Sequence, residues 1–282
     1  MSKPWALVVP SSRGIGQHLT RALLKRTNLP ILATCRQDPE GTKAALLRDL
    51  TPPPPSSPSP PLCERLHLAR VDVTDEASIR AAAAHAAETL FPRATHHLHL
   101  SFALPGILHV DKSAEAVDAG ATLESFRVNT LGPLLLMKHF VPFLPRPSTA
   151  TSSSPSLPPH AIWVNMTARV GSVADNNGQG GWYTYRATKA AVNSLTRTLD
   201  LQLRARTTVT TTAADTLPAF AVAYHPGTVR TDFSRDYWEG SERRGQLLDP
   251  EFAAERVLDV VLGLKIEQRG RIWDWTGNEI PP

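Results

Sequence analysis

Tyr185 and Lys189 are the residues whose types and spacing point most directly to chemistry. In a helix, residues four apart lie on the same face, so the Lys189 ammonium would stand beside the Tyr185 phenol. A neighbouring positive charge favours the phenolate and lowers the pKa of the phenol toward the working pH. The pair is therefore predicted to act as a general acid or base on a carbonyl or hydroxyl group.

A glycine-containing loop near the start of the chain predicts a phosphate site. Gly14 and Gly16 would let the backbone approach a pyrophosphate, and the free N–H groups of the following helix would attract the anion. The residues assigned to this site are Ser11, Ser12, Arg13, Gly14, Ile15 and Gly16. On the loop alone, an ordinary glycine turn before a helix is an equally good interpretation.

The residue that closes the second apolar run predicts which dinucleotide binds. An acidic residue there would favour NAD, whereas this chain has Arg36, which with Arg13 can hold a 2′-phosphate. The predicted cofactor is therefore NADP(H). The alternative is that both are solvated surface arginines.

Two further segments follow apolar runs and are predicted to contact the same cofactor. Asp72, followed by Val73, is placed to accept a hydrogen bond from an adenine amino group. The competing interpretation is a strand-end or helix-cap aspartate. Gly106 would again permit close backbone approach.

The elements that must position these residues alternate between two types. Strand-length apolar runs occur at residues 5–9, 30–35, 66–73, 97–102, 161–165 and 220–224, and helix-like stretches at residues 15–25, 76–90, 123–143, 185–204 and 250–264. This alternation predicts an α/β fold of the Rossmann type, a doubly wound, mostly parallel sheet with helices on both faces. We expect a single domain over residues 1–282, with exposed insertions at residues 51–61, 145–159 and 207–216. A polyproline ligand for a partner domain is the alternative for the first insertion.

Composition excludes several classes of protein. With 41% hydrophobic residues the chain can build a core, and its two cysteines, Cys35 and Cys63, form neither a disulfide framework nor a metal site. The first apolar run is too short for a signal peptide, and residues 131–144 are interrupted by Pro133 and Lys138. The net charge of +4 is scattered, which argues against nucleic-acid binding. We expect a cytoplasmic protein with a small anionic ligand.

Several motifs in fixed order resemble the short-chain dehydrogenase/reductase family from about residue 5 to the end. They are the glycine loop, Asp72-Val73, residues 128–130 around Asn129, Gly171-Ser172, residues 185–189, and residues 226–231. Residues 169–172, 180–183 and 273–281 are similar to the branch of sniffer-type carbonyl reductases and bacterial C-factor proteins. The resemblance implies that Tyr185 is the acid/base, that Lys189 also binds the nicotinamide ribose, and that Asn129 holds a proton-relay water. It also implies that Pro226, Gly227, Val229 and Thr231 enclose the nicotinamide.

The chain departs from the family pattern at three places. Pro10 replaces the first loop glycine and lacks an N–H, and the family's Asn-Ala-Gly after the fourth strand is Leu104-Pro105-Gly106. The substrate-orienting serine is replaced by Ala168. Losing such a donor typically lowers the rate by about 10² to 10³. Thr167, or else Ser172, is the predicted substitute, and Thr167 is preferred.

The leading hypothesis is an NADPH-dependent reductase that transfers hydride between nicotinamide and a small, apolar carbonyl or alcohol substrate. Ala168 and Pro10 favour a rival from another class, an NADP(H)-binding sensor or partner-binding protein with little catalysis. A third possibility is an epimerase or dehydratase on the same fold. The sequence leaves the substrate, the physiological direction and the choice between monomer and homo-oligomer (dimer or tetramer) open.

Overall fold

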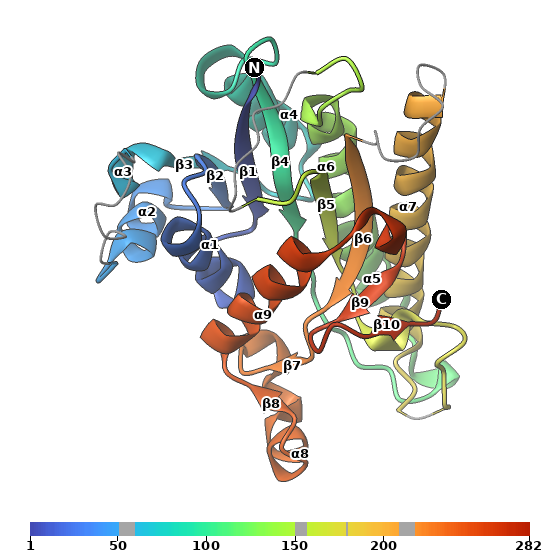
Figure 1. Ribbon diagram of the computed structural model, residues 1–282. Helices are drawn as coiled ribbons and strands as arrows, with labels where there is room; N and C mark the ends of the chain where they lie inside the picture. Colours follow the sequence, from blue (N-terminus) through green and yellow to red (C-terminus); the bar gives the residue numbers. More distant parts are fainter. Residues whose placement is uncertain (51–59, 150–156, 179, 209–217) are drawn as a thin grey trace.

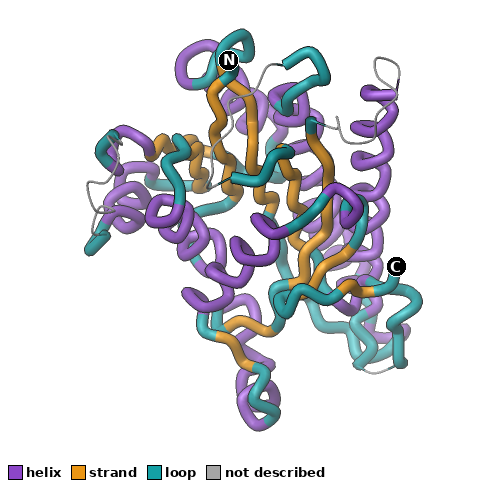
Figure 2. The backbone as a smooth tube through the Cα atoms, in the orientation of Figure 1, coloured by secondary structure: helices purple, strands orange, loops and turns teal. Residues whose placement is uncertain are grey.

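The computed structural model describes residues 1–50, 60–149, 157–178, 180–208 and 218–282. An 8-stranded sheet in the order β10-β9-β6-β5-β4-β1-β2-β3 forms its centre, and every pairing is parallel except β10 with β9 (Figures 1 and 2). The predicted doubly wound α/β architecture is confirmed.

The strands of this sheet are β1 Lys3–Val9, β2 Ile31–Cys35, β3 Leu66–Arg70, β4 His96–Ala103, β5 Ala161–Met166, β6 Ala219–His225, β9 Ile272–Asp274 and β10 Glu279–Ile280. A separate parallel pair is formed by β7 Thr228–Val229 and β8 Leu247–Leu248. The helices are α1 Gly14–Arg26, α2 Pro39–Leu47, α3 Leu62–Arg65, α4 Glu76–His85, α5 Ala119–Phe126, α6 Gly132–Phe140, α7 Tyr183–Thr208, α8 Trp238–Arg243 and α9 Pro250–Gly263. Short turns include the π-helical η3 Arg127–Leu131 and the 3₁₀-helical η7 Asp232–Tyr237.

The central strands are almost entirely apolar because helices cover both faces of the sheet. Along β1, Trp5, Leu7 and Val9 enter the core shared with α4, α6 and α7, whereas Ala6 and Val8 enter the core shared with α1 and α9. Figure 1 shows α1 and α9 on one side of the sheet and α7 on the other. Because successive side chains of a strand point to opposite faces of the sheet, β1 contributes to the hydrophobic cores on both faces.

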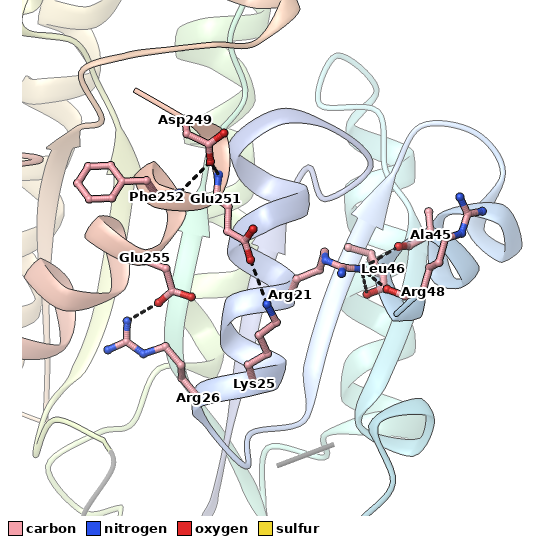
Figure 3. Close-up of polar contacts among 10 residues, drawn as sticks. All are labelled: Arg21, Lys25, Arg26, Ala45, Leu46, Arg48, Asp249, Glu251, Phe252 and Glu255. Carbon is pink, nitrogen blue, oxygen red and sulfur yellow. Dashed lines mark hydrogen bonds and ion pairs between the residues drawn. The ribbon is translucent and has the colours of Figure 1, made fainter. Parts of the chain in front are cut away.

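On one face of the sheet, helix α1 packs beside both α9 and α2. Lys25 pairs with Glu251 at 3.0 Å and Arg26 with Glu255 at 2.7 Å, and Arg21 donates to the carbonyls of residues 45, 46 and 48 (Figure 3). Exposed ion pairs stabilise a fold by about 1 kcal/mol or less each. Burial of the apolar face of α1 therefore contributes more to fixing the helix that follows the glycine loop.

The strand order reverses between β1 and β4, because β2 and β3 continue on one side of β1 and β5 and β6 on the far side of β4. In open α/β sheets the ligand crevice lies beyond the carboxyl ends of the strands at such a switch point. The glycine loop leaves β1 there and residues 104–106 leave β4 there. The fold thus brings two segments that are far apart in sequence to the same edge of the sheet, where this rule places the ligand crevice.

The single helix expected over residues 123–143 is replaced by α5, η3 and α6 in succession. Pro133 lies in the first turn of α6 and has no N–H, so an α-helical bond to the carbonyl of Asn129 cannot form. The chain widens into the π turn at this point. Within the described residues, no helix is long and apolar enough to cross a bilayer.

The insertions differ in part from the expectation that they are exposed. Residues 51–59, 150–156 and 209–217 lie outside the described residues, so that prediction is not tested there. At the ends of the second insertion, however, Pro145 and Pro158 are buried. Helix α7 also runs on to Thr208, into the third predicted insertion.

A buried chain of hydrogen bonds joins the amino end of β4 to the second insertion. Ser2 Oγ lies 3.0 Å from His97 Nδ1, His97 Nε2 lies 3.2 Å from His99 Nδ1, and His99 Nε2 donates to the Pro158 carbonyl at 3.0 Å. All three hydrogen bonds can form with both imidazoles neutral. Burial lowers the pKa of His97 and of His99 from 6.5 to about 4.

Acid is therefore expected to destabilise the fold. In the unfolded chain both histidines bind protons near pH 6.5, so their contribution to stability is present above that pH and is lost as the pH falls toward about 4. The free energy of unfolding should drop by up to about 3 kcal/mol for each of the two histidines across this window. Denaturant titrations at several pH values measure the drop, and His99→Gln should flatten it while the exposed control His85→Gln does not. An unchanged profile in His99→Gln would contradict the assignment.

Candidate active site

Tyr185 and Lys189 lie in the first turns of α7, and both are buried. The Lys189 Nζ atom lies 5.7 Å from the centroid of the Tyr185 ring and donates to the Met166 carbonyl at 3.0 Å. The predicted helical spacing thus brings the ammonium over the phenol ring, and the end of β5 supplies its hydrogen-bond partner.

The protonation states differ from the expectation drawn from the pair alone. Burial raises the pKa of the Tyr185 phenol, and burial lowers the pKa of Lys189 to about 8. Removal of water from both groups outweighs their mutual stabilisation. The predicted lowering of the Tyr185 pKa is therefore wrong for this structure, in which the phenol is protonated at neutral pH.

Gly106 lies where three functional side chains converge. A Cβ atom at this position would lie 3.7 Å from Lys189 Nζ, 3.8 Å from Asn129 Oδ1 and 3.6 Å from Phe233 Cε2. Phe233 also lies 6.0 Å from Tyr185, ring centroid to ring centroid. The end of β4, the π turn, α7 and η7 thus meet at one point, and a side chain on residue 106 would narrow it.

Asn129 holds the loop after β4 in place. Its Oδ1 accepts from the Ile107 N–H at 2.7 Å, and its Nδ2 donates to the Ile107 carbonyl at 2.9 Å and to Thr188 Oγ1 at 3.2 Å. The side chain is fully buried. Asn129 therefore fixes the backbone next to Gly106. The backbone carbonyl of Asn129 receives no α-helical hydrogen bond from residue 133, because Pro133 has no N–H.

Asp111 positions the start of α7, and sequence reasoning did not find it. Its carbonyl accepts from the Trp182 N–H at 2.6 Å, and its Oδ2 accepts from the Thr184 N–H at 2.9 Å. Gly181 has φ +67°, and a Cβ there would lie 2.6 Å from the Asp111 carbonyl oxygen. Asp111 therefore caps the amino end of α7 immediately before Tyr185. This contact joins residues that are far apart in the sequence, so it exists only in the folded chain.

The glycine loop has the geometry of an anion site. Gly14 has φ +56°, a Cβ on Gly16 would lie 1.9 Å from the Pro10 carbonyl oxygen, and α1 begins without a side-chain cap. The peptide bond before Pro10 is cis. Ser11 is buried, and its N–H and hydroxyl donate to the carbonyls of Thr34 and Val8. Its donors therefore serve the turn, while Ser12, Arg13 and Ile15 stay at the start of the helix.

The other predicted cofactor residues fall on the same crevice edge. Arg36 follows β2 and is exposed, and Asp72 lies beyond the end of β3, which the sequence had placed at residue 73. Asp72 Oδ1 accepts from the N–H and hydroxyl of Thr74, and these bonds lower the pKa of the carboxyl, with a smaller contribution from Arg36. Val73 packs on Gly132 of α6.

Residues 226–231 close the crevice from the other side. Gly227 has φ +76°, and Val229 is buried in the short strand β7. Thr231 Cγ2 lies 3.5 Å from the position of a Cβ on Gly14. Pro226 precedes this turn directly after β6. The segment predicted to enclose a nicotinamide is thus in contact with the predicted phosphate loop.

The hydroxyls of Thr167 and Ser172, the two predicted substitutes for the missing serine, both donate hydrogen bonds to other residues. The Thr167 hydroxyl donates to Asn193 Oδ1 at 2.6 Å, and the Ser172 hydroxyl donates to the Pro282 carbonyl at 3.3 Å. Ala168 has φ −142° and ψ 149°, so the extended backbone turns the side chains of residues 167 and 168 to opposite sides. This geometry favours neither hydroxyl, and the role of Thr167 stays a prediction.

Aromatic side chains flank the start of α7. Trp182 and Tyr237 meet edge to face with ring centroids 5.4 Å apart, and Phe233 is 43% exposed beside Tyr185. Among the described residues, no group of three or more His, Cys, Asp or Glu side chains could hold a metal ion. Phe233 therefore supplies an apolar surface next to the Tyr185 ring on the side of η7.

Comparisons with known proteins agree with this geometry. No protein-family model matches the chain. C-signal of Myxococcus xanthus is 31% identical over 165 residues, which cover 58% of this chain and 81% of the relative. The structure is similar to that of an NADPH-bound carbonyl reductase from chicken fatty liver, with 26% identity, full coverage of both chains and a TM-score of 0.76. It is also similar in fold to the carbonyl reductase Sniffer of D. melanogaster, with 23% identity, full coverage of both chains and a TM-score of 0.74. The resemblance predicted from the motifs is confirmed, and the chain belongs to the short-chain dehydrogenase/reductase family.

Proposed function

We propose that this protein is an NADPH-dependent reductase of small, apolar carbonyl compounds. The observation that carries the proposal is the convergence of Lys189 Nζ and Asn129 Oδ1 within 4 Å of the Gly106 Cβ position, beside the buried Tyr185 phenol. Proton transfer needs a positioned, correctly protonated group, and close approach of a cofactor needs the glycine.

The residues present fit an NADP(H) molecule. Gly14 leaves room beside the loop that a side chain would fill, and Gly16 lets α1 pack closely against the Pro10 carbonyl. The uncapped α1 offers free N–H groups, and Arg13 and Arg36 are exposed cations near the crevice. Thr231, next to Gly14, would contact the nicotinamide end. When bound, NADPH supplies the hydride that reduces a carbonyl carbon.

Tyr185 is assigned as the general acid. The raised pKa keeps its hydroxyl protonated at neutral pH, the state needed to donate a proton to the oxygen of a carbonyl that is being reduced. Lys189, with a pKa lowered to about 8, keeps most of its positive charge at pH 7. That charge stabilises the negative charge that develops on the phenol oxygen as the proton leaves, and in a buried site this effect is much stronger than in water.

An apolar substrate is supported by the aromatic side chains next to the phenol. Phe233 lies beside Tyr185, and Trp182 and Tyr237 contribute further ring surface at the start of α7. Such surface binds apolar groups and leaves orientation to a few polar atoms. Cytoplasmic placement and homo-oligomer formation stay predictions.

A sensor or partner-binding protein is the second candidate, and one observation favours it. The hydroxyls of Thr167 and Ser172 are both committed to other residues, so the substrate oxygen has a single side-chain donor in Tyr185. Tight NADPH binding with no turnover on a panel of aliphatic and aromatic carbonyls would make this candidate the better one.

Cofactor choice is the first test of the proposal. NADPH should bind more tightly than NADH by about 1.5–3 kcal/mol, the range for charge-assisted hydrogen bonds to a phosphate. Arg36→Ala should remove much of this preference and leave NADH affinity unchanged, as measured by nucleotide fluorescence titration. Equal affinities in the wild type would rule out NADPH as the preferred cofactor.

A further inference from the structure

Arg70 lies at the crevice edge next to Arg36, although the two are distant in sequence. Strands β2 and β3 run parallel with Cys35 opposite Arg70, so both strands end at the same edge of the sheet. The Arg70 Nε–H donates to the Arg36 carbonyl at 3.0 Å. Arg70 is exposed, and this bond fixes its guanidinium against the residue assigned to the cofactor phosphate.

Neither guanidinium is neutralised by an acid. Among the described residues, no ion pair involves Arg36 or Arg70. The nearby carboxylates bond to their own backbone, because Asp38 accepts from the Gly41 N–H at 2.8 Å and Asp72 accepts from the Thr74 N–H at 2.9 Å. Two adjacent cations that form no ion pair within the described residues favour an anionic ligand.

The hydrogen bond to Arg36 uses only one of the three guanidinium nitrogens of Arg70. With Nε bonded to a carbonyl, the two terminal nitrogens of Arg70 can donate to a tetrahedral anion in a bidentate way. In a dinucleotide-binding sheet the 2′ position of the adenosine ribose lies beyond the end of the second strand, which here is the position of Arg36. The position of Arg70 beside it is set by the register of β2 and β3.

We propose that Arg70 is a specificity-determining residue that holds the 2′-phosphate of NADP(H) together with Arg36. The inference rests on the proposed cofactor and extends it to a residue that the motif order does not mark. A purely structural role, in which Arg70 only supports the turn at Arg36, would affect nucleotides with and without the phosphate equally.

The test uses two fragments of the cofactor and no catalysis. Adenosine 2′,5′-bisphosphate and 5′-AMP are titrated into the full-length protein by calorimetry. Arg70→Gln keeps an N–H donor for the Arg36 carbonyl but deletes the charge, so the Kd of the bisphosphate should rise about tenfold or more while that of 5′-AMP is unchanged. Arg70→Lys should retain part of the affinity because it keeps the charge.

Arg243→Gln is the matched control, since Arg243 is also exposed and donates its Nε–H to a backbone carbonyl, that of Glu239, at 3.4 Å. It should leave both fragments unaffected. If the wild type prefers the bisphosphate and Arg70→Gln retains that preference, the role of Arg70 is overturned and the cofactor assignment stands. Equal weakening of both fragments by Arg70→Gln overturns the role as well. If the wild type shows no preference, the cofactor assignment fails together with this proposal.

Discussion

Tyr185→Phe is expected to lower the rate of carbonyl reduction by about 10² or more, because general acid catalysis typically contributes about 10² to 10⁴. The ring and its packing beside Phe233 are retained, so only the donated proton is lost. NADPH affinity should stay within about twofold of the wild type, since a phenol hydroxyl contributes little to binding compared with the charged groups. Single-turnover reduction followed by nicotinamide absorbance separates the chemical step from binding.

Thr167→Val is the matched comparison for this experiment. It removes the hydroxyl predicted to replace the missing serine, while the geometry places that hydroxyl on Asn193. A rate loss as large as that of Tyr185→Phe, with an unchanged Tm, would assign Thr167 to the substrate. Full activity of Tyr185→Phe on a substrate that the wild type reduces would refute the proposed mechanism.

Lys189→Met should lower both the reductive rate and the affinity for NADPH. The variant keeps the buried apolar stem and deletes the ammonium, which is proposed to act on the phenol and on the nicotinamide ribose. We expect about a 10- to 100-fold weaker Kd, the range for a lost charged hydrogen bond, and a rate loss of about 10² or more. The exposed Lys138→Met on α6 is the control.

The pH dependence of binding gives a second measurement for the same residue. The pKa of Lys189 is lowered to about 8, so its charge is present below that pH and is lost as the pH rises through it. Wild-type affinity for NADPH should therefore weaken between about pH 7 and 9, and Lys189→Met should lack this dependence. An identical pH profile in both proteins would show that the ammonium does not contact the cofactor.

The order of elements in this fold could be predicted because burial on both faces leaves a direct trace in the sequence. Strands such as β1, β5 and β6 are short apolar runs, and the helices between them have one apolar face. The boundaries were less accurate. The π turn at residues 127–131 depends on how Pro133 is accommodated, and the end of β3 at Arg70 depends on its pairing with β2.

By itself, the sequence determined the family and the parallel α/β architecture, and it predicted which residues line the crevice. The reason is that glycine, tyrosine and lysine carry requirements of backbone space and charge that hold wherever the fold is formed. Of these residues, the structure brings Gly106 and Lys189 close together and places Gly14 next to Thr231.

Only the tertiary structure decided which of these groups are available. The Ser11 N–H donates to the Thr34 carbonyl, and the Thr167 hydroxyl donates to the Asn193 side chain, so neither donor is free for a ligand. Asp111 gains its role by meeting the start of α7. A hydrogen bond commits a donor to one partner, and burial sets the protonation state of a phenol or an amine. Both depend on atoms that sequence neighbours do not supply.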